Sequence, residues 1–173
     1  MFDFANPVFF ANENYQPIEC MMLDRSLGLE LENQLCFALY AASNAVTRIY
    51  RPLLARLGLT YPQYLVMIVL WQDGARPIGK IAERLRLGPS AIVPLVDQLQ
   101  RHGFVQRRRD SADRRMVFIE LTEAGAAMER QVAAARDAVV CRLAMEDEQL
   151  SALRAELTHL TARLAEVEDA EAF

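Results

Sequence analysis

The chain has 173 residues and a formal net charge of −4, with 53% hydrophobic and 24% charged residues. This composition is typical of a soluble globular protein with its own core. The apolar runs are far shorter than the roughly 18 residues that a membrane span requires, so we expect no membrane partner.

The N-terminal residues and the cysteines indicate where the protein works. Residues 1–28 lack a basic start followed by an apolar core, so they do not resemble a signal peptide and we expect a cytoplasmic protein with an N-terminal extension. Cys20, Cys36 and Cys141 are widely separated and form no CxxC motif. We therefore predict free thiols, no metal and no cofactor, and we assign no role to Cys20.

The regular spacing of apolar residues predicts two helices in the first half of the chain. A helix is expected over 29–57 because apolar side chains recur every three or four residues, at Leu31, Leu35, Leu39 and Ala42. Pro52 should bend or end it. A second helix should begin after Thr60 and end at Gly74. It is apolar nearly all round, so we place it at the centre of the fold.

The middle of the chain predicts a winged helix. PIGKIAERLRLG and AIVPLVDQLQRHG form two short helices with a tight joint at 87–89, as in a helix-turn-helix. Their predicted core residues are Ile81, Ala82, Leu85, Ile92, Leu95, Val96 and Leu99. FVQRRR and RRMVFIEL, on either side of a turn at 110–113, predict a basic β-hairpin, the wing.

The C-terminal part is expected to be helical. One long alanine-rich helix should begin at Thr122-Glu123, and a last helix carries a coiled-coil-like stripe formed by Leu150, Leu153, Leu157, Leu160 and Leu164. The stripe either packs within the chain or, as we favour, against a second copy. The predicted fold is mainly α with a small β-hairpin wing. Residues 61–121 form the winged helix-turn-helix DNA-binding domain, and residues 29–60 and 122–173 form a helical dimerisation domain.

The distribution of charge is compatible with DNA as the partner. Between Arg76 and Arg115 ten Lys/Arg face four Asp/Glu, a local balance of +6 that leaves −10 for the rest of the chain. Such a segment suits a polyanion, although a solvated arginine-rich surface has the same composition. The predicted DNA contacts are Ser90, Ala91, Val93 and Gln98 on the second short helix, and Arg107, Arg108, Arg109, Asp113, Arg114 and Arg115 in the wing.

Several features of this predicted interface shape the expected binding. Arginine suits the narrow minor groove, and Asp113 should hold the side chain of Arg115. Asp97 should repel phosphate. Few side chains of the second short helix can donate hydrogen bonds to bases, so we expect few direct contacts to base edges. A dimer would bind a roughly palindromic operator.

The stretch LCFALY places Cys36 among apolar neighbours, so the thiol is either a packing group or a reactive one. Tyr40 lies one turn further along the same helix face. Tyr50 is roughly 21 Å along the axis, so it can reach only the Cys36 of an antiparallel partner, as can Tyr61. The residues alone favour the packing role.

The run from Leu31 to Trp71 resembles the start of the organic hydroperoxide-sensing repressors, the OhrR branch of the MarR family. RRRDSADRRMVFIELTEAG resembles the wing and the following helix start of MarR regulators generally. The resemblance implies a homodimeric repressor in which Cys36 reacts with an organic hydroperoxide and forms an intersubunit disulfide with Cys141. It also implies that Tyr50 and Tyr61 hydrogen-bond the thiol from the other subunit.

The resemblance also covers two further features. It places Tyr40 in the thiol pocket, and Asp113 and Arg115 match the wing-tip pair of the family. The helix GPSAIVPLVDQLQ departs from the branch, whose recognition helix is richer in threonine and lysine. This difference affects the operator sequence rather than the thiol site.

These features favour a redox-sensing repressor that is not an enzyme. One alternative is a MarR-type regulator gated by a small phenolic ligand. A second is a thiol peroxidase, which is disfavoured because no arginine or threonine sits beside Cys36 in sequence to polarise a peroxide. A third is a helical interaction protein with no DNA role.

Overall fold

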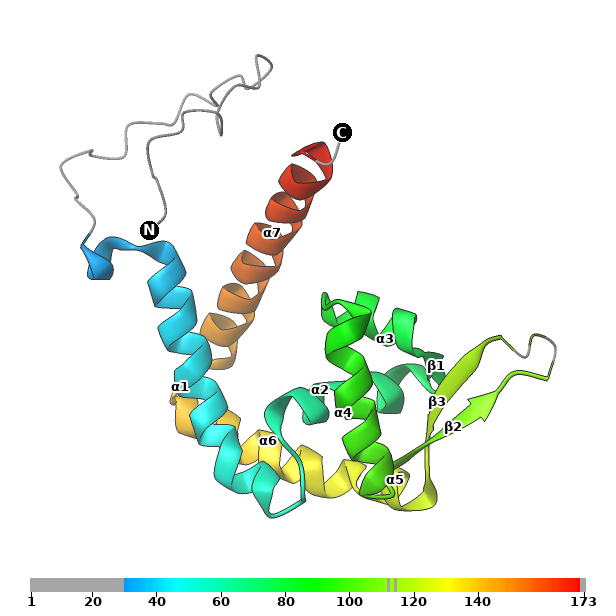
Figure 1. Cartoon of the computed structure of the whole chain (residues 1–173). Helices are drawn as coiled ribbons and strands as arrows, with labels where there is room; N and C mark the ends of the chain where they lie inside the picture. The colour runs from blue at the N-terminus through cyan, green and yellow to red at the C-terminus, as the bar shows by residue number, and fades with distance from the viewer. Residues whose placement is uncertain (1–29, 112, 114, 172–173) are drawn as a thin grey trace, which may run out of the picture. The chain divides into compact units, whose positions relative to one another are not determined.

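A computed structural model describes residues 30–111, 113 and 115–171 (Figure 1). The predicted extension 1–28 with Cys20, and Arg114 in the wing, lie outside the described residues. The chain divides into two compact units, 1–42 and 43–173. The predicted division into dimerisation and DNA-binding domains is a different one, and it stays a prediction.

The first predicted helix begins later than its apolar spacing suggested. A short 3-10 helix, η2 (Leu31–Asn33), precedes α1 (Leu35–Ala55). Gln34 separates them because its backbone is extended, with φ −88° and ψ 117°. α1 ends three residues after Pro52, in line with the predicted effect of that proline on the helix.

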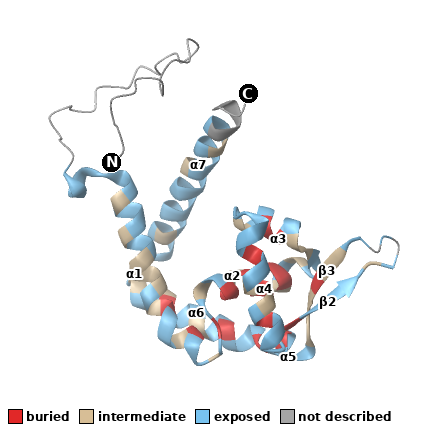
Figure 2. Cartoon of the chain, viewed as in Figure 1, coloured by how far each residue is buried: buried red, intermediate tan, exposed pale blue. Residues whose placement is uncertain are grey.

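Helix α2 (Tyr61–Asp73) forms the centre of the core, as its composition predicted. Thr60 caps its N-terminus, and Gly74 ends it with a left-handed φ of 73°, a conformation that glycine adopts without strain. The buried apolar side chains of this helix are Val66, Met67, Val69 and Leu70. Figure 2 shows buried residues gathered where α2 and α4 lie.

The helix-turn-helix is confirmed. It comprises α3 (Ile78–Leu85) and α4 (Pro89–Arg101), which are joined through Arg86 in the left-handed region at φ 53°. The predicted core residues Ile81, Ala82, Ile92, Val96 and Leu99 are buried, and Leu85 and Leu95 are partly buried against them.

The predicted wing hairpin is confirmed, and it belongs to a three-stranded antiparallel sheet of order β1-β3-β2. Strands β2 (Val105–Arg109) and β3 (Val117–Leu121) pair so that Arg107 lies opposite Ile119. The third strand, β1 (Arg76–Pro77), pairs with the other edge of β3 and was not predicted. Two residues are too few to show a strand pattern in the sequence.

The single long helix predicted from Thr122 is wrong. The chain forms α5 (Glu123–Ala127) and α6 (Glu129–Leu143), with a break at Met128. The indole N–H of Trp71 donates to the carbonyl oxygen of Gly125 at 3.1 Å, which is the acceptor that the N–H of Glu129 would use in a continuous α-helix. A tertiary contact therefore competes with the helical hydrogen bond at this point.

The last helix, α7 (Asp147–Glu171), follows the predicted pattern. Along its leucine stripe, Leu153, Leu157 and Leu164 are exposed in the chain on its own. Across the residues that the structure describes, we find no helix with both the length and the apolar character to cross a membrane.

Candidate functional site

Three tyrosines pack together where α1 ends and α2 begins. The ring centroid of Tyr50 lies 5.3 Å from that of Tyr61 and 5.4 Å from that of Tyr64, and Tyr61 and Tyr64 are 5.7 Å apart. Tyr50 and Tyr64 are buried and Tyr61 is half-buried. We call Tyr50, Tyr61 and Tyr64 the tyrosine cluster.

The surroundings of the cluster raise the pKa of two of its phenols. Burial, followed by the proximity and hydrogen bond of Tyr50, raises the pKa of Tyr64 well above its ordinary value of 10.0. Burial and Tyr50 also raise the pKa of Tyr61. Neutral phenols are hydrogen-bond donors, which is what an anion such as a thiolate requires. Sequence reasoning missed Tyr64, although its spacing of three residues from Tyr61 places the two on one helix face.

Both described cysteines are free and exposed. Cys36 lies in the first turn of α1, and Cys141 lies near the C-terminal end of α6. Cys36 does not pack within the core of its own chain, and packing against a second copy stays a prediction. Tyr40, 67% exposed, belongs with Cys36 to the unit that ends at Ala42, whereas Cys141 and the tyrosine cluster belong to the other unit. The predicted meeting of Cys36 with tyrosines of a partner stays a prediction.

The recognition helix α4 exposes the residues predicted to face DNA, namely Ser90, Ala91, Val93 and Gln98. Gln98 is also bound within the chain, because its Oε1 accepts a hydrogen bond from Nε2 of Gln63 at 2.7 Å. Asp97 is not a free negative charge on this helix. Its Oδ1 lies 2.6 Å from Nη2 of Arg107 in the wing, which lowers the expected repulsion of phosphate.

The wing arginines differ in how strongly the chain itself binds them. Besides Asp97, Arg107 contacts Oε1 of Gln100 at 3.1 Å. Arg108 pairs with Glu120 at 2.7 Å and lies 5.4 Å from the ring centroid of Phe118. The hydrogen bond from Arg108 is the main reason that the pKa of Glu120 is lowered.

The exposed tip of the wing carries Arg109 and Arg115. Asp113 does contact Arg115, but the bond is to its backbone N–H at 2.9 Å and not to the guanidinium group. The carboxylate of Asp113 therefore stabilises the backbone of the turn. It does not bind the side chain of Arg115, as the sequence had predicted.

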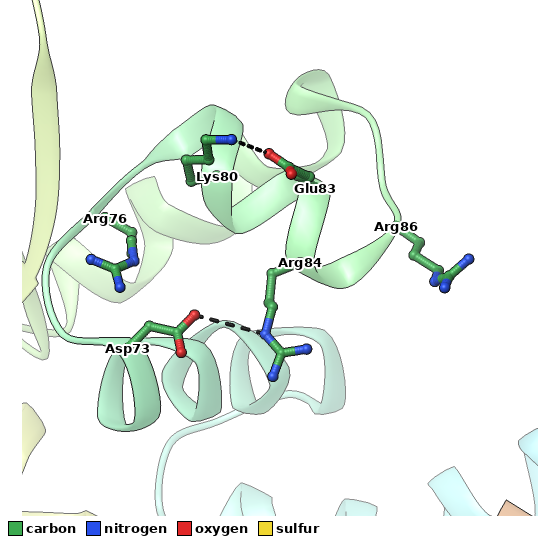
Figure 3. A pocket seen from close by; sticks show the side chains of 6 residues that line it. All are labelled: Asp73, Arg76, Lys80, Glu83, Arg84 and Arg86. Carbon is green, nitrogen blue, oxygen red and sulfur yellow. Dashed lines mark hydrogen bonds and ion pairs between the residues drawn. The ribbon is translucent and has the colours of Figure 1, made fainter. Parts of the chain in front are cut away.

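A basic pocket lies beside α3 and was not predicted as a site. Figure 3 shows the six charged side chains that line its volume of about 320 Å³: Asp73, Arg76, Lys80, Glu83, Arg84 and Arg86. Lys80 pairs with Glu83 at 2.6 Å, and Arg84 lies 3.7 Å from Asp73. Four cations against two anions leave a net charge of +2. This adds a second group of positive charges to the arginines of the wing.

A second pocket, between α2 and α6, has a volume of about 430 Å³ and a mixed character. Its lining residues are Tyr64, Ile68, Trp71, Gln72, Glu129, Val132, Ala133 and Arg136. Aromatic faces beside a guanidinium group suit an aromatic acid. The described residues contain no cluster of three or more His, Cys, Asp or Glu that would hold a metal ion.

A helix-turn-helix flanked by the strands of a three-stranded sheet, two of which form an arginine-rich hairpin after it, defines a winged-helix DNA-binding protein. Residues 59–117 match the family model of the MarR family. The chain is 41% identical over 103 residues to the organic hydroperoxide resistance transcriptional regulator of Bacillus subtilis (strain 168), covering 60% of this chain and 70% of that relative. It is 31% identical over 124 residues to the HTH-type transcriptional regulator MgrA of Staphylococcus aureus, covering 71% and 84%.

The chain therefore belongs to the MarR family, and it is a transcriptional regulator of the MarR type. The fold is similar to that of reduced AbfR bound to DNA, from Staphylococcus epidermidis, with a TM-score of 0.65, 29% identity and coverage of 78% of this chain and 94% of that chain. It is also similar to CouR from Rhodococcus jostii RHA1 bound to p-coumaroyl-CoA, with a TM-score of 0.67, 27% identity and coverage of 76% and 94%. These relatives are regulators rather than enzymes.

Proposed function

We propose that the protein is a thiol-based repressor that binds operator DNA when Cys36 is reduced and leaves it when an organic hydroperoxide oxidises Cys36. The observation that carries this proposal is the tyrosine cluster, because three packed phenols bring together hydroxyl groups that can donate hydrogen bonds to a sulfur anion. The 41% identity to a regulator named for organic hydroperoxide resistance supports the same function. The exposure of both thiols makes them accessible to an oxidant.

The proposed chemistry has two steps. The Cys36 thiolate attacks one peroxide oxygen, the O–O bond breaks, and the alkoxide leaves and takes a proton to become an alcohol. Sulfur is oxidised by two electrons to the sulfenic acid as the peroxide is reduced. The thiolate of Cys141 in a partner subunit then attacks that sulfur, the S–O bond breaks, a disulfide forms, and the hydroxide that leaves takes a proton to become water. A dithiol reductant restores both thiols.

In this proposal, Tyr50 and Tyr61 of one subunit donate hydrogen bonds to the Cys36 thiolate of the other, and Tyr40 completes the pocket. The homodimer places two winged helices on a roughly palindromic operator, in the cytoplasm. Ser90, Ala91 and Val93, with the exposed arginines of the wing, are the proposed contacts. Disulfide formation changes the spacing of the two winged helices, so they no longer match successive half-sites.

The test begins with a duplex that the reduced protein selects from a random-sequence pool. We expect cumene hydroperoxide to release wild-type protein from this duplex, and a dithiol to restore binding. Non-reducing electrophoresis should show a reductant-sensitive dimer that Cys36→Ser and Cys141→Ser both lack. Cys20→Ser is the matched control and should behave like the wild type. Full release of Cys36→Ser by the hydroperoxide would refute the proposal.

The α2–α6 pocket favours a second candidate, a regulator gated by a phenolic ligand. Its lining brings Trp71, Tyr64 and Arg136 together, and the similar CouR structure holds p-coumaroyl-CoA. Trp71 is the single tryptophan of the chain, so its fluorescence reports on this pocket directly. Saturable quenching of the Trp71 fluorescence by p-coumarate would show that the pocket binds the ligand. If p-coumarate also releases the Cys36→Ser variant from DNA, this candidate is supported over cysteine oxidation.

A further inference from the structure

We propose that Gln63 is a positioning residue that couples the tyrosine cluster to the recognition helix through Gln98. This inference rests on the proposed function of Cys36 and names the route by which its oxidation reaches the DNA-binding surface. Gln63 lies in the first turn of α2, next to Tyr64 and two residues after Tyr61 of the cluster. Gln98 lies on α4, 35 residues further along the chain.

The burial of Gln63 is unusual for its residue type. Its side chain is 1% exposed, and it is the one buried polar side chain among the residues that the structure describes. A buried amide has to be hydrogen-bonded, and that of Gln63 makes two bonds. Its Oε1 accepts from the backbone N–H of Thr60 at 2.8 Å, and its Nε2 donates to Oε1 of Gln98 at 2.7 Å.

The first of these bonds determines the direction of the second. A backbone N–H can only donate, so the atom of Gln63 that faces Thr60 must be the oxygen. The nitrogen then faces Gln98, which has to present its own oxygen in return. The orientation of the Gln98 amide on the recognition helix is therefore set by the N-terminal cap of α2. A rotation of that amide would place two nitrogens against each other.

This arrangement links motion of the tyrosine cluster to motion of α4. Tyr61, Gln63 and Tyr64 lie in the same turn, so a change in the hydrogen bonds of the two phenols moves the amide with them. Apart from the hydroxyls of Tyr50 and Tyr64, the buried core is apolar. Apolar contacts are not directional, whereas the hydrogen bond of 2.7 Å from Gln63 tolerates little displacement. When the α2 turn shifts, α4 must follow or leave a buried N–H of Gln63 unpaired.

The test is the ratio of the Kd for DNA after and before oxidation by cumene hydroperoxide, with the duplex selected by the wild-type protein. Because each variant is compared with itself, a direct effect of the substitution on DNA contact cancels. Gln98→Leu removes the acceptor and should reduce the ratio by about two- to tenfold, the range expected for one neutral hydrogen bond. Gln98→Glu keeps an acceptor for Gln63 and should keep the ratio, although its added negative charge weakens binding in both states.

Two controls separate this coupling from a structural role. Gln131→Leu, an exposed glutamine on α6, should keep the wild-type ratio. Disulfide formation in Gln98→Leu, followed by non-reducing electrophoresis, should proceed as in the wild type, because the variant leaves the thiols and the tyrosine cluster in place. Its thermal unfolding midpoint reports that the variant is folded.

The outcomes also separate this inference from the proposed function. A Gln98→Leu protein that is oxidised normally and keeps the wild-type ratio would overturn the coupling and leave the redox switch standing. If Gln98→Glu also lowers the ratio of the Kd after oxidation to the Kd before it, the assigned direction of the hydrogen bond from Gln63 to Gln98 is overturned. If wild-type protein itself stays on DNA after oxidation, the redox switch fails and the coupling fails with it.

Discussion

The ion pair between the recognition helix and the wing offers a direct test of how this regulator uses its charges. Asp97 lies 2.6 Å from Arg107, and the two side chains are 46% and 35% exposed. Asp97→Asn removes one negative charge from the face of α4 that we propose meets DNA. It also releases Arg107 from its strongest partner, so that the guanidinium group becomes available to phosphate. We expect the variant to bind DNA more tightly.

The size of the effect follows from counterion release. One added phosphate contact steepens the slope of log K against log salt by about 0.9, which at about 0.15 M salt corresponds to an affinity gain of about fivefold, or about 1 kcal/mol. The loss of the ion pair itself should cost folding little. Both side chains of the pair are partly exposed and screened by water, so its contribution to stability is about 0–1 kcal/mol.

The assay is fluorescence anisotropy with the selected duplex over a series of salt concentrations. Asp137→Asn is the matched control, because it removes the same charge and an ion pair with Arg136 on α6, away from the helix-turn-helix in the sequence. We expect the control to keep the wild-type salt slope. Weaker binding by Asp97→Asn would show that Asp97 instead holds Arg107 in the geometry that DNA requires. An unchanged slope would show that the released Arg107 makes no new phosphate contact.

Three further predictions address stability and assembly. A Cβ on Gly125 would lie 2.0 Å from the carbonyl oxygen of Phe104. Gly125→Ala should therefore lower the free energy of unfolding by about 1–3 kcal/mol, measured by urea unfolding. The control Gly79→Ala has open space around the added Cβ and should be neutral or stabilising. Because the pKa of Tyr64 is raised, folded protein holds that proton more tightly than unfolded protein, and stability should fall as pH rises above about 10. Tyr64→Phe should reduce this alkaline loss in urea titrations, and an equal loss in both proteins would contradict the assignment. Leu157→Asp on the exposed stripe of α7 should weaken a dimer by at least about tenfold in sedimentation equilibrium, and an unchanged association constant would place the interface elsewhere.

Local sequence patterns determined much of the fold. The apolar spacing located α2 at the centre, and the cap at Thr60 and the turn at Gly74 marked its ends. The helix-turn-helix and the basic hairpin followed from periodicities of 3.6 and 2 residues, which each segment carries within itself. The resemblance of the sequence indicated the MarR family, and the matches to known regulators confirm it.

Contacts between distant parts of the chain decided the rest. Near the end of α5, Trp71 donates to the carbonyl oxygen of Gly125, 54 residues away, and so competes with the helical hydrogen bond. The alanine-rich sequence of the predicted long helix contains no signal for that break. In the same way, packing against Tyr50 brings Tyr64 into the cluster, and Gln98 gives the buried Gln63 its second bond. The spacing of apolar residues predicts the conformation of one segment, because it depends only on that segment. The contacts of Trp71, Tyr64 and Gln63 depend on how separate segments pack against each other in the folded core.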